Sequence, residues 1–296
     1  MSYIGEFAAL ATALLWSGTS IAFSEASQRI NTIYVNITRM VLAIIFLVIT
    51  MLLFGIQIDL SFRQIFFLSV SGIIGLIIGD TFLFKAYQNI GARLAMLIMA
   101  LAPAIAAVLA YIFLNENLSY LGVLGIIITI AGVAIVVFER QEIPSSKYKI
   151  DKLGIFYAFL GAVGQAVGLI FAKFALNEGT INSFTANFMR LFASVIILYP
   201  LAVMTKKFNK PITVFMNDKK AFIYTAIGAI LGPFFGITLS MVAITYSKIG
   251  IASTLMATSP IIMLPMIRYY YKEKLTWISI LGAFVAVGGV ALLFLV

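Results

Sequence analysis

The chain has 296 residues, of which 62% are hydrophobic and only 10% are charged, and its mean hydropathy is +1.10. A soluble domain carries about 25% charged residues, so this composition excludes a water-soluble surface over most of the chain. Cysteine and histidine are both absent, which excludes disulfides, thiol nucleophiles and imidazole chemistry. The net charge of +9 lies mainly in connections between apolar runs, so it does not indicate nucleic-acid binding. We expect no metal site and no cofactor.

Ten apolar runs, each bounded by charged or turn residues, predict ten transmembrane helices, because a helix needs about 20 residues to cross the hydrocarbon. The chain is therefore predicted to be an all-α membrane protein. In chain order the predicted helices cover about residues 4–24, 32–55, 65–87, 94–114, 119–138, 153–174, 183–204, 221–245, 251–270 and 276–296.

The connections between the predicted helices differ in length and charge. Those at 139–152 and 205–220 are long and basic, whereas the others are tight and make consecutive helices antiparallel neighbours. An even number of helices brings both termini to the same side of the membrane. Lys and Arg residues concentrate on the opposite side, so the positive-inside rule predicts that both termini face outside.

The second half of the chain repeats the first. A shift of 157 residues aligns Gly, Pro and Glu positions over a long stretch without a gap, and a shift of 151 aligns an Asn and an Arg upstream. We divide the chain into a first copy (residues 1–139), a connecting loop (140–152) and a second copy (153–296). The matched pairs include Gly75 and Gly232, Gly79 and Gly236, Pro103 and Pro260, Glu116 and Glu273, Asn36 and Asn187, and Arg39 and Arg190.

The two copies must cross the membrane in opposite directions, because each holds five predicted helices, an odd number. Two inverted five-helix repeats around a central cavity form the architecture in which a midplane site opens first to one side and then to the other. The repeat therefore favours a carrier that works by alternating access. A duplicated structural scaffold and a channel are the alternatives.

The matched residues carry a family resemblance that covers essentially the whole chain. The chain resembles the ten-helix drug/metabolite transporter superfamily, and within it the EamA-type exporters, as two tandem EamA-like units. The resemblance implies export of a small molecule, and relatives handle amino acids, other metabolites, nucleotide sugars and drugs. Many relatives carry basic termini that indicate cytoplasmic ends, in conflict with the charge pattern of this chain. The motifs are Leu14-Leu15-Trp16-Ser17-Gly18, Arg39 and Arg190, Gly79-Asp80-Thr81, Ile90-Gly91-Ala92, and Pro103 with Asn115-Glu116-Asn117-Leu118, repeated as Pro260 with Lys272-Glu273-Lys274-Leu275.

Asp80 is the most informative charged residue, because it lies inside the third predicted helix, where a charge is costly. Its match in the second copy is the apolar Ile237, so the acid breaks the symmetry of the repeat. We predict that Asp80 binds the substrate or a coupling ion. The alternative is a structural ion pair with Arg39 or Lys85.

Arg39 and Arg190 lie at matched positions about seven residues into the second and seventh predicted helices. Asn36 and Asn187 precede them by about one helical turn and share their faces. The duplication favours a structural role, such as capping a carbonyl or pairing with an acid. The alternative is that these residues bind an anionic group of the substrate.

Four further residues are candidates for a substrate or coupling site. Glu6 is a candidate proton-coupling carboxylate, although an acid near the start of a helix also suits the helix dipole. Trp16 and Tyr87 are candidates to line a cavity that stacks aromatic substrates, or else anchor the helices at the interface. Gln165 stands where the first copy has Trp16, so the role of that ring is not duplicated.

Pro103 and Pro260 occupy matched places in the middle of the fourth and ninth predicted helices. A proline inside a membrane helix removes one backbone hydrogen bond and kinks the helix. We therefore predict matched kinks that serve as hinges for the two copies. Static curvature is the alternative.

The leading functional hypothesis is a secondary-active exporter of small metabolites, amino acids among them, that resides in the cell (inner or plasma) membrane. The chain has no G-x-x-x-x-G-K-[ST] motif, so we expect an ion gradient, such as that of protons, or the substrate gradient to supply the energy. We expect the protein to work as a monomer in the lipid bilayer. A channel or facilitator and a membrane-embedded enzyme are the alternatives, and the lack of His, Cys and carboxylate clusters disfavours the enzyme.

Overall fold

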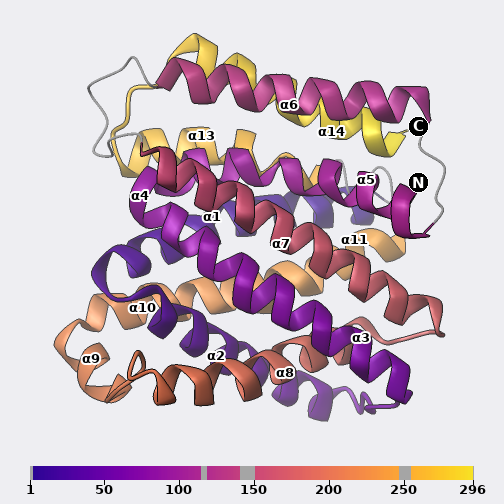
Figure 1. The fold of residues 1–296 in the computed structure, drawn as a ribbon, viewed down its shortest axis with the longest axis vertical. Coiled ribbons are helices and arrows are strands. Elements are labelled where there is room, and N and C mark those ends of the chain that lie inside the picture. Colours follow the sequence, from indigo (N-terminus) through magenta and orange to yellow (C-terminus); the bar gives the residue numbers. More distant parts are fainter. Residues whose placement is uncertain (1–2, 115–118, 141–150, 247–254, 296) are drawn as a thin grey trace.

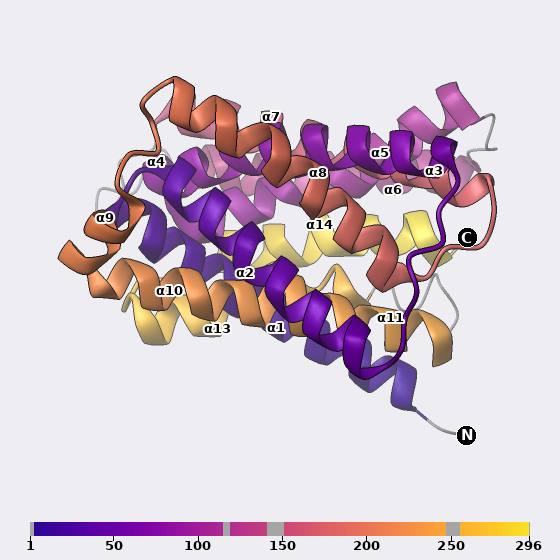
Figure 2. The ribbon, with the colours of Figure 1, turned by 90° about the horizontal axis from the view of Figure 1, so that it is seen from below.

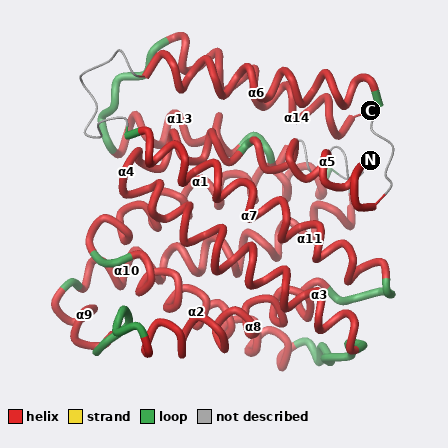
Figure 3. Tube along the Cα trace, viewed as in Figure 1, coloured by secondary structure: helices red, strands yellow, loops and turns green. Residues whose placement is uncertain are grey.

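The computed structural model describes residues 3–114, 119–140, 151–246 and 255–295, and within these ranges every regular element is a helix. Figure 3 shows that helices account for nearly all of the described chain. The elements are α1 (Ile4–Arg29), α2 (Thr32–Leu53), α3 (Phe62–Gly72), η1 (Ile73–Gly79), α4 (Asp80–Met99), α5 (Leu101–Leu114), α6 (Tyr120–Arg140), α7 (Lys152–Asn177), α8 (Ser183–Met204), α9 (Pro211–Asn217), α10 (Lys219–Ala229), η2 (Ile230–Gly236), α11 (Ile237–Tyr246), α13 (Ser259–Tyr270) and α14 (Trp277–Leu295).

The prediction of an all-α membrane protein with ten spans is confirmed. Seven helical segments within the described residues are long and apolar enough to cross a membrane, and one of them, Phe62–Met99, holds parts of two spans. α5 and α14 are shorter apolar helices, and α13 lies in the ninth predicted span. Large apolar side chains cover the outside of the bundle, and Leu52, for example, is 78% exposed. Such a surface suits lipid rather than water.

Gly91 separates the third span from the fourth. Its φ of 75° and ψ of 168° interrupt α4, and only glycine adopts this conformation without strain. The chain then reverses direction, so that α5 runs back alongside the other long helices (Figure 1). The tight connection predicted between residues 87 and 94 is therefore present.

Helices of the two copies are interleaved rather than packed as separate bundles. α1 of the first copy packs on α10, η2 and α11 of the second, and α7 of the second copy packs on α3, η1 and α4 of the first. α2 pairs with α8, and α6 pairs with α14. Each span thus meets the other copy in the same way as its counterpart does, as an inverted repeat requires. Figure 2 shows α1, α10 and α11 together on one side of the molecule and α3, α4 and α7 on the other.

Glycines allow α7 to cross η1 closely. A Cβ on Gly164 would lie 2.6 Å from the Cα of Gly79, and one on Gly168 would lie 3.0 Å from the Cα of Gly75. Small residues on both helices let α7 and η1 approach without side chains between them. At the crossing of α1 over η2 the glycines instead contact side chains of α1, and a Cβ on Gly236 would lie 2.6 Å from Nε1 of Trp16.

Two short π-helical segments lie at these crossings. η1 and η2 are each seven residues long, and their bounds are related by the same shift of 157 residues that aligns the copies. Each lies between two α-helical stretches of one span. A π-helix shifts backbone hydrogen bonds to a longer spacing and is frequent at functional sites. The apolar pattern of the sequence does not predict these segments.

The two prolines lie within the fourth and ninth spans, as expected, directly after an interruption of the helix. Pro103 is the third residue of α5, and Pro260 lies in the first turn of α13. A proline has no N–H to bond to the carbonyl four residues earlier, which belongs to Met99 or Met256 on the other side of the interruption. The predicted kink is therefore an interruption of the helix just before each proline, at Ala100 between α4 and α5 and near Thr258 before α13. The hinge role stays a prediction.

The basic connection at 205–220 also differs from the expected loop. It contains the short helix α9, which begins at Pro211. Most of the other long connection, residues 141–150, and the Asn115–Leu118 motif lie outside the described residues.

Candidate substrate and coupling site

Asp80 begins α4, directly after the π-helical segment η1, and is only 5% exposed. Its two carboxylate oxygens have different partners. Oδ2 pairs with Nη2 of Arg39 from α2, whereas Oδ1 accepts a hydrogen bond of 2.6 Å from Nε2 of Gln165 on α7. The carboxylate is therefore held by the first copy through Arg39 and by the second copy through Gln165.

Asn36 fixes the arginine that binds Asp80. Its Oδ1 accepts a hydrogen bond of 3.0 Å from Nε of Arg39, one helical turn away. Its Nδ2 donates to the backbone carbonyl of Leu76 in η1 at 3.0 Å and to Oγ1 of Thr81 at 3.2 Å. The Asn–Arg pair predicted from the repeat is thus formed, and it connects α2 to the π-helical segment.

Aromatic rings cover the Arg39 guanidinium. Its central carbon lies 5.5 Å from the ring centroid of Phe23 and 5.0 Å from that of Phe84. Tyr87 stacks on Phe84 with a centroid distance of 5.8 Å, and its hydroxyl lies 3.3 Å from the sulfur of Met96. Tyr87 therefore packs on a ring that covers the Arg39 guanidinium, and it lines neither of the cavities described below.

The second copy of the Asn–Arg pair lies at the same crossing. Asn187 and Arg190 come from α8, which packs against α3 and η1. Nη2 of Arg190 would lie 3.4 Å from a Cβ on Gly75, so its guanidinium rests against the glycine face of η1. Arg190 is also close enough to Asp80 for an electrostatic interaction. Nδ2 of Asn187 and Nε of Arg190 are buried and have no hydrogen-bond partner among the described residues.

Gln165 and Trp16 occupy equivalent places in the two crossings. Nε2 of Gln165 donates to Asp80 and lies 3.4 Å from the carbonyl of Gly75, whereas the indole of Trp16 packs against Gly236. Trp16 belongs to a small apolar cluster with residues such as Ala9. Because Gln165 replaces the tryptophan ring with an amide, the crossing of α7 and η1 has a hydrogen-bond donor for Asp80.

Glu6 lies in the first turn of α1, at the N-terminal end of the helix, and is partly buried. It is ten residues before Trp16 and so about three helical turns from the α1–η2 crossing. The structure thus keeps Glu6 at one end of the bundle, whereas Asp80, Arg39, Asn36, Gln165 and Arg190 meet where α7 crosses η1.

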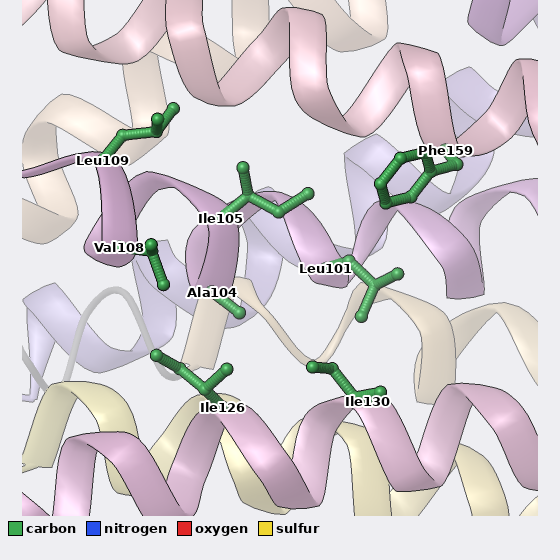
Figure 4. Close-up of a pocket in the computed structure, with 8 residues that line it drawn as sticks. All are labelled: Leu101, Ala104, Ile105, Val108, Leu109, Ile126, Ile130 and Phe159. Atoms are coloured by element: carbon green, nitrogen blue, oxygen red, sulfur yellow. The ribbon is translucent and has the colours of Figure 1, made fainter.

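Two cavities lie away from this polar group. One of about 210 Å³ lies between α5, α6 and α7, and Figure 4 shows its apolar lining, which includes Leu101, Ile130 and Phe159. The other, of about 290 Å³, lies between α1, α10 and α13 and is lined by residues such as Tyr224 and Tyr270. Asp80 lines neither cavity and is buried. The described conformation therefore shields the polar group from both of them.

Two segments of the chain, residues 3–138 and 152–295, match the family model described as the EamA-like transporter family. An "Uncharacterized transporter" of Archaeoglobus fulgidus is 22% identical over 288 residues, which cover 97% of this chain and 96% of that protein. An "Uncharacterized transporter" of Clostridium kluyveri is 27% identical over 143 residues, 48% of this chain and 45% of the relative, so this match spans less than half the length of the relative.

Two further similarities concern a named transporter and a fold. The Arabidopsis thaliana protein "Probable magnesium transporter NIPA6" is 33% identical over 104 residues, which are 34% of this chain and 32% of that protein. A solved crystal structure matches all of this chain and 98% of its own with a TM-score of 0.69 at 14% sequence identity. At that identity the match shows a shared fold.

Proposed function

Because the chain belongs to the EamA-like transporter family, we propose that it is a secondary-active carrier that exports small metabolites, amino acids among them, by alternating access. The observation that carries the proposal is the buried polar group at the crossing of the two copies. Asp80 is bound there by one residue from each copy, Arg39 and Gln165. A movement of one copy against the other must therefore change the environment of this carboxylate.

The contacts of Asp80 suggest how transport is coupled. A proton on Asp80 would remove its charge and weaken its ion pair with Arg39, while the hydrogen bond from Gln165 would lose its ionic acceptor. The two copies would then be free to separate at the crossing of α7 and η1. This mechanism assigns coupling to Asp80 and leaves the break before Pro103 and its counterpart at Pro260 as hinges.

Magnesium transport is a second candidate, because a segment of the chain resembles a protein named as a magnesium transporter. Mg²⁺ in proteins is bound by carboxylate and other oxygen ligands. The described residues hold no group of three or more acids that meets this need, and Asp80 is already paired with Arg39. We therefore favour an organic substrate over a divalent cation.

Counterflow in proteoliposomes tests the proposal and separates a carrier from a channel. Vesicles containing the protein are loaded with one unlabelled amino acid at a time, and uptake of the same labelled amino acid is followed. A carrier takes up label faster when the vesicle interior holds its substrate, whereas a channel does not. In the matched arm, the vesicles are loaded with Mg²⁺ in place of the amino acid, and uptake of labelled Mg²⁺ is followed. The proposal is contradicted if uptake is accelerated only in the Mg²⁺ arm, or if no loaded solute accelerates uptake.

A further inference from the structure

The two Asn–Arg pairs of the repeat differ in how their donors are satisfied. In the first copy, Nδ2 of Asn36 and Nε of Arg39 both have acceptors. In the second copy, the same two atoms of Asn187 and Arg190 are buried and have no acceptor among the described residues. A buried donor without a partner is destabilising, and more so when it is charged. The second pair is therefore arranged for an acceptor that the described part of the chain does not supply.

The charges show the same difference. Arg39 is neutralised by Asp80, but the position that matches Asp80 in the second copy is Ile237, which has no charge. Asp80 lies within electrostatic range of Arg190, yet both of its carboxylate oxygens are already bound by other residues. Arg39, Asp80 and Arg190 together therefore carry one excess positive charge in a buried, membrane-embedded place, where a single negative charge would be favourable.

The geometry favours a carboxylate over other anions. A guanidinium presents a planar fork of N–H donors that matches the two oxygens of a carboxylate, and the amide of Asn187 adds one more donor. One negative charge balances the excess of one positive charge, whereas a doubly charged phosphate would overcompensate it. The glycine face of η1 leaves the Arg190 guanidinium beside Gln165, next to Asp80.

We propose that Arg190 and Asn187 bind the carboxylate of the transported metabolite. This carboxylate pairs with Arg190 as the carboxylate of Asp80 pairs with Arg39. This inference rests on the proposed transport function and narrows its substrate to small monocarboxylates and amino acids. It assigns different tasks to the two matched arginines, since Arg39 binds the protein's own acid and Arg190 binds that of the substrate.

Thermal unfolding of the purified protein in a chloride buffer tests the inference. The probes are the proteinogenic amino acids and a set of short monocarboxylates, each compared with its own primary amide, together with inorganic phosphate and sulfate. We expect at least one acid to raise the unfolding temperature while its amide does not. Equal stabilisation by acid and amide, equal stabilisation by phosphate or sulfate, or no stabilisation by any probe would overturn the inference.

Two variants connect the effect to these residues. Arg190→Gln is expected to weaken binding of the acid by at least tenfold. Asn187→Asp places a carboxylate three residues before Arg190, at the spacing with which Asn36 Oδ1 reaches Arg39 Nε at 3.0 Å. It should therefore satisfy Arg190 internally, abolish binding of the acid and leave the unfolding temperature without ligand no lower than in the native protein. This second variant keeps the test decisive if Arg190→Gln does not fold.

Arg63→Gln is the matched control, because the Arg63 side chain is 73% exposed and pairs with Glu178 at the end of the bundle. Its affinity for the acid should stay within twofold of the native value. Native affinity in Arg190→Gln or Asn187→Asp would overturn the inference. Counterflow of an uncharged or cationic solute, unchanged in both variants, would overturn the carboxylate site while leaving the carrier function intact. Absence of counterflow with every solute would contradict the carrier function itself.

Discussion

At the residue scale, the Asp80 carboxylate joins two elements of different copies, since Arg39 lies on α2 and Gln165 on α7. The sequence indicated Asp80 and offered Arg39 or Lys85 as its partner. Lys85 instead lies near the rings of Phe82 and Tyr157, with its Nζ 5.3 Å from the centroid of Tyr157. The choice between the two cations depends on how closely α2 approaches α4, which hydropathy and spacing do not encode.

The Asn–Arg pairs could be predicted as pairs, because their spacing is that of one helical turn. The difference between the two pairs, that only the first has acceptors for its donors, could not be predicted. Whether Asn187 and Arg190 find acceptors depends on side chains of other helices, such as Ile237 in place of an acid. Gln165 was a candidate for the substrate or coupling site because it replaces a tryptophan, but its hydrogen bond to Asp80 follows from the crossing of α7 and η1.

The ion pair leads to a prediction for Asp80. Asp80→Asn leaves Arg39 buried without its counter-charge, and loss of one partner of a buried pair costs about 3–5 kcal/mol. The unfolding temperature should therefore fall, whereas Arg39→Gln with Asp80→Asn should recover most of it because Arg39 no longer leaves a buried charge without its partner. Counterflow should stay at least tenfold below native in both proteins if the carboxylate couples transport. Native counterflow in the double variant would show that the pair is only structural.

At the scale of elements, the π-helical segments and the glycine crossings occur together. The small-residue spacing of Gly75 and Gly79 predicted a close helix contact, but not that α7 of the other copy would supply it. The π-helical segments could not be predicted, since one longer hydrogen-bonded turn leaves the apolar pattern of a span almost unchanged. The prolines of α5 and α13 predicted an interruption of each span, but a run of apolar residues does not show at which residue the helix restarts.

A substitution at the crossing tests its contribution to stability. A Cβ on Gly164 would lie 2.6 Å from the Cα and 3.0 Å from the backbone nitrogen of Gly79, and backbone atoms cannot move aside as a flexible side chain would. Gly164→Ala should therefore destabilise the protein by about 1–3 kcal/mol, a typical cost of overpacking. Gly288→Ala is the matched control, because nothing lies within 4 Å of its added Cβ. Equal unfolding temperatures for the two variants would show that α7 and η1 separate at little cost.

At the scale of the whole molecule, hydropathy located the spans to within a few residues, and α8 covers the same residues as the seventh predicted helix. It did not indicate which spans are neighbours. Apolar runs report only that a segment crosses the bilayer, whereas the pairing of α1 with α10 and of α7 with α4 depends on matched small faces. The inverted repeat provided the one long-range constraint, because it requires both crossings to be alike.

The direction of the bundle in the membrane can be measured directly, because the chain has no cysteine. The connection between α2 and α3 lies at the end where α1 begins, and the connection between α8 and α9 lies at the opposite end (Figure 1). The positive-inside rule predicts that Asp59→Cys reacts with a membrane-impermeant maleimide in intact cells and that Lys207→Cys reacts only after permeabilisation. Both residues are exposed. The reverse pattern would place the termini in the cytoplasm.

The interleaving of the copies also affects how the protein is made. α1 leaves the ribosome long before its partners η2 and α11, which begin only at Ile230 and Ile237. Ser17 of α1 donates to the carbonyl of Ser259, which is synthesised later still. Until the second copy is inserted, α1 therefore lies in the bilayer or beside the insertion machinery without these partners. The packing of α1 on the second copy is therefore completed only after that copy is inserted, and a nascent chain halted after its first copy should remain a target for membrane quality control.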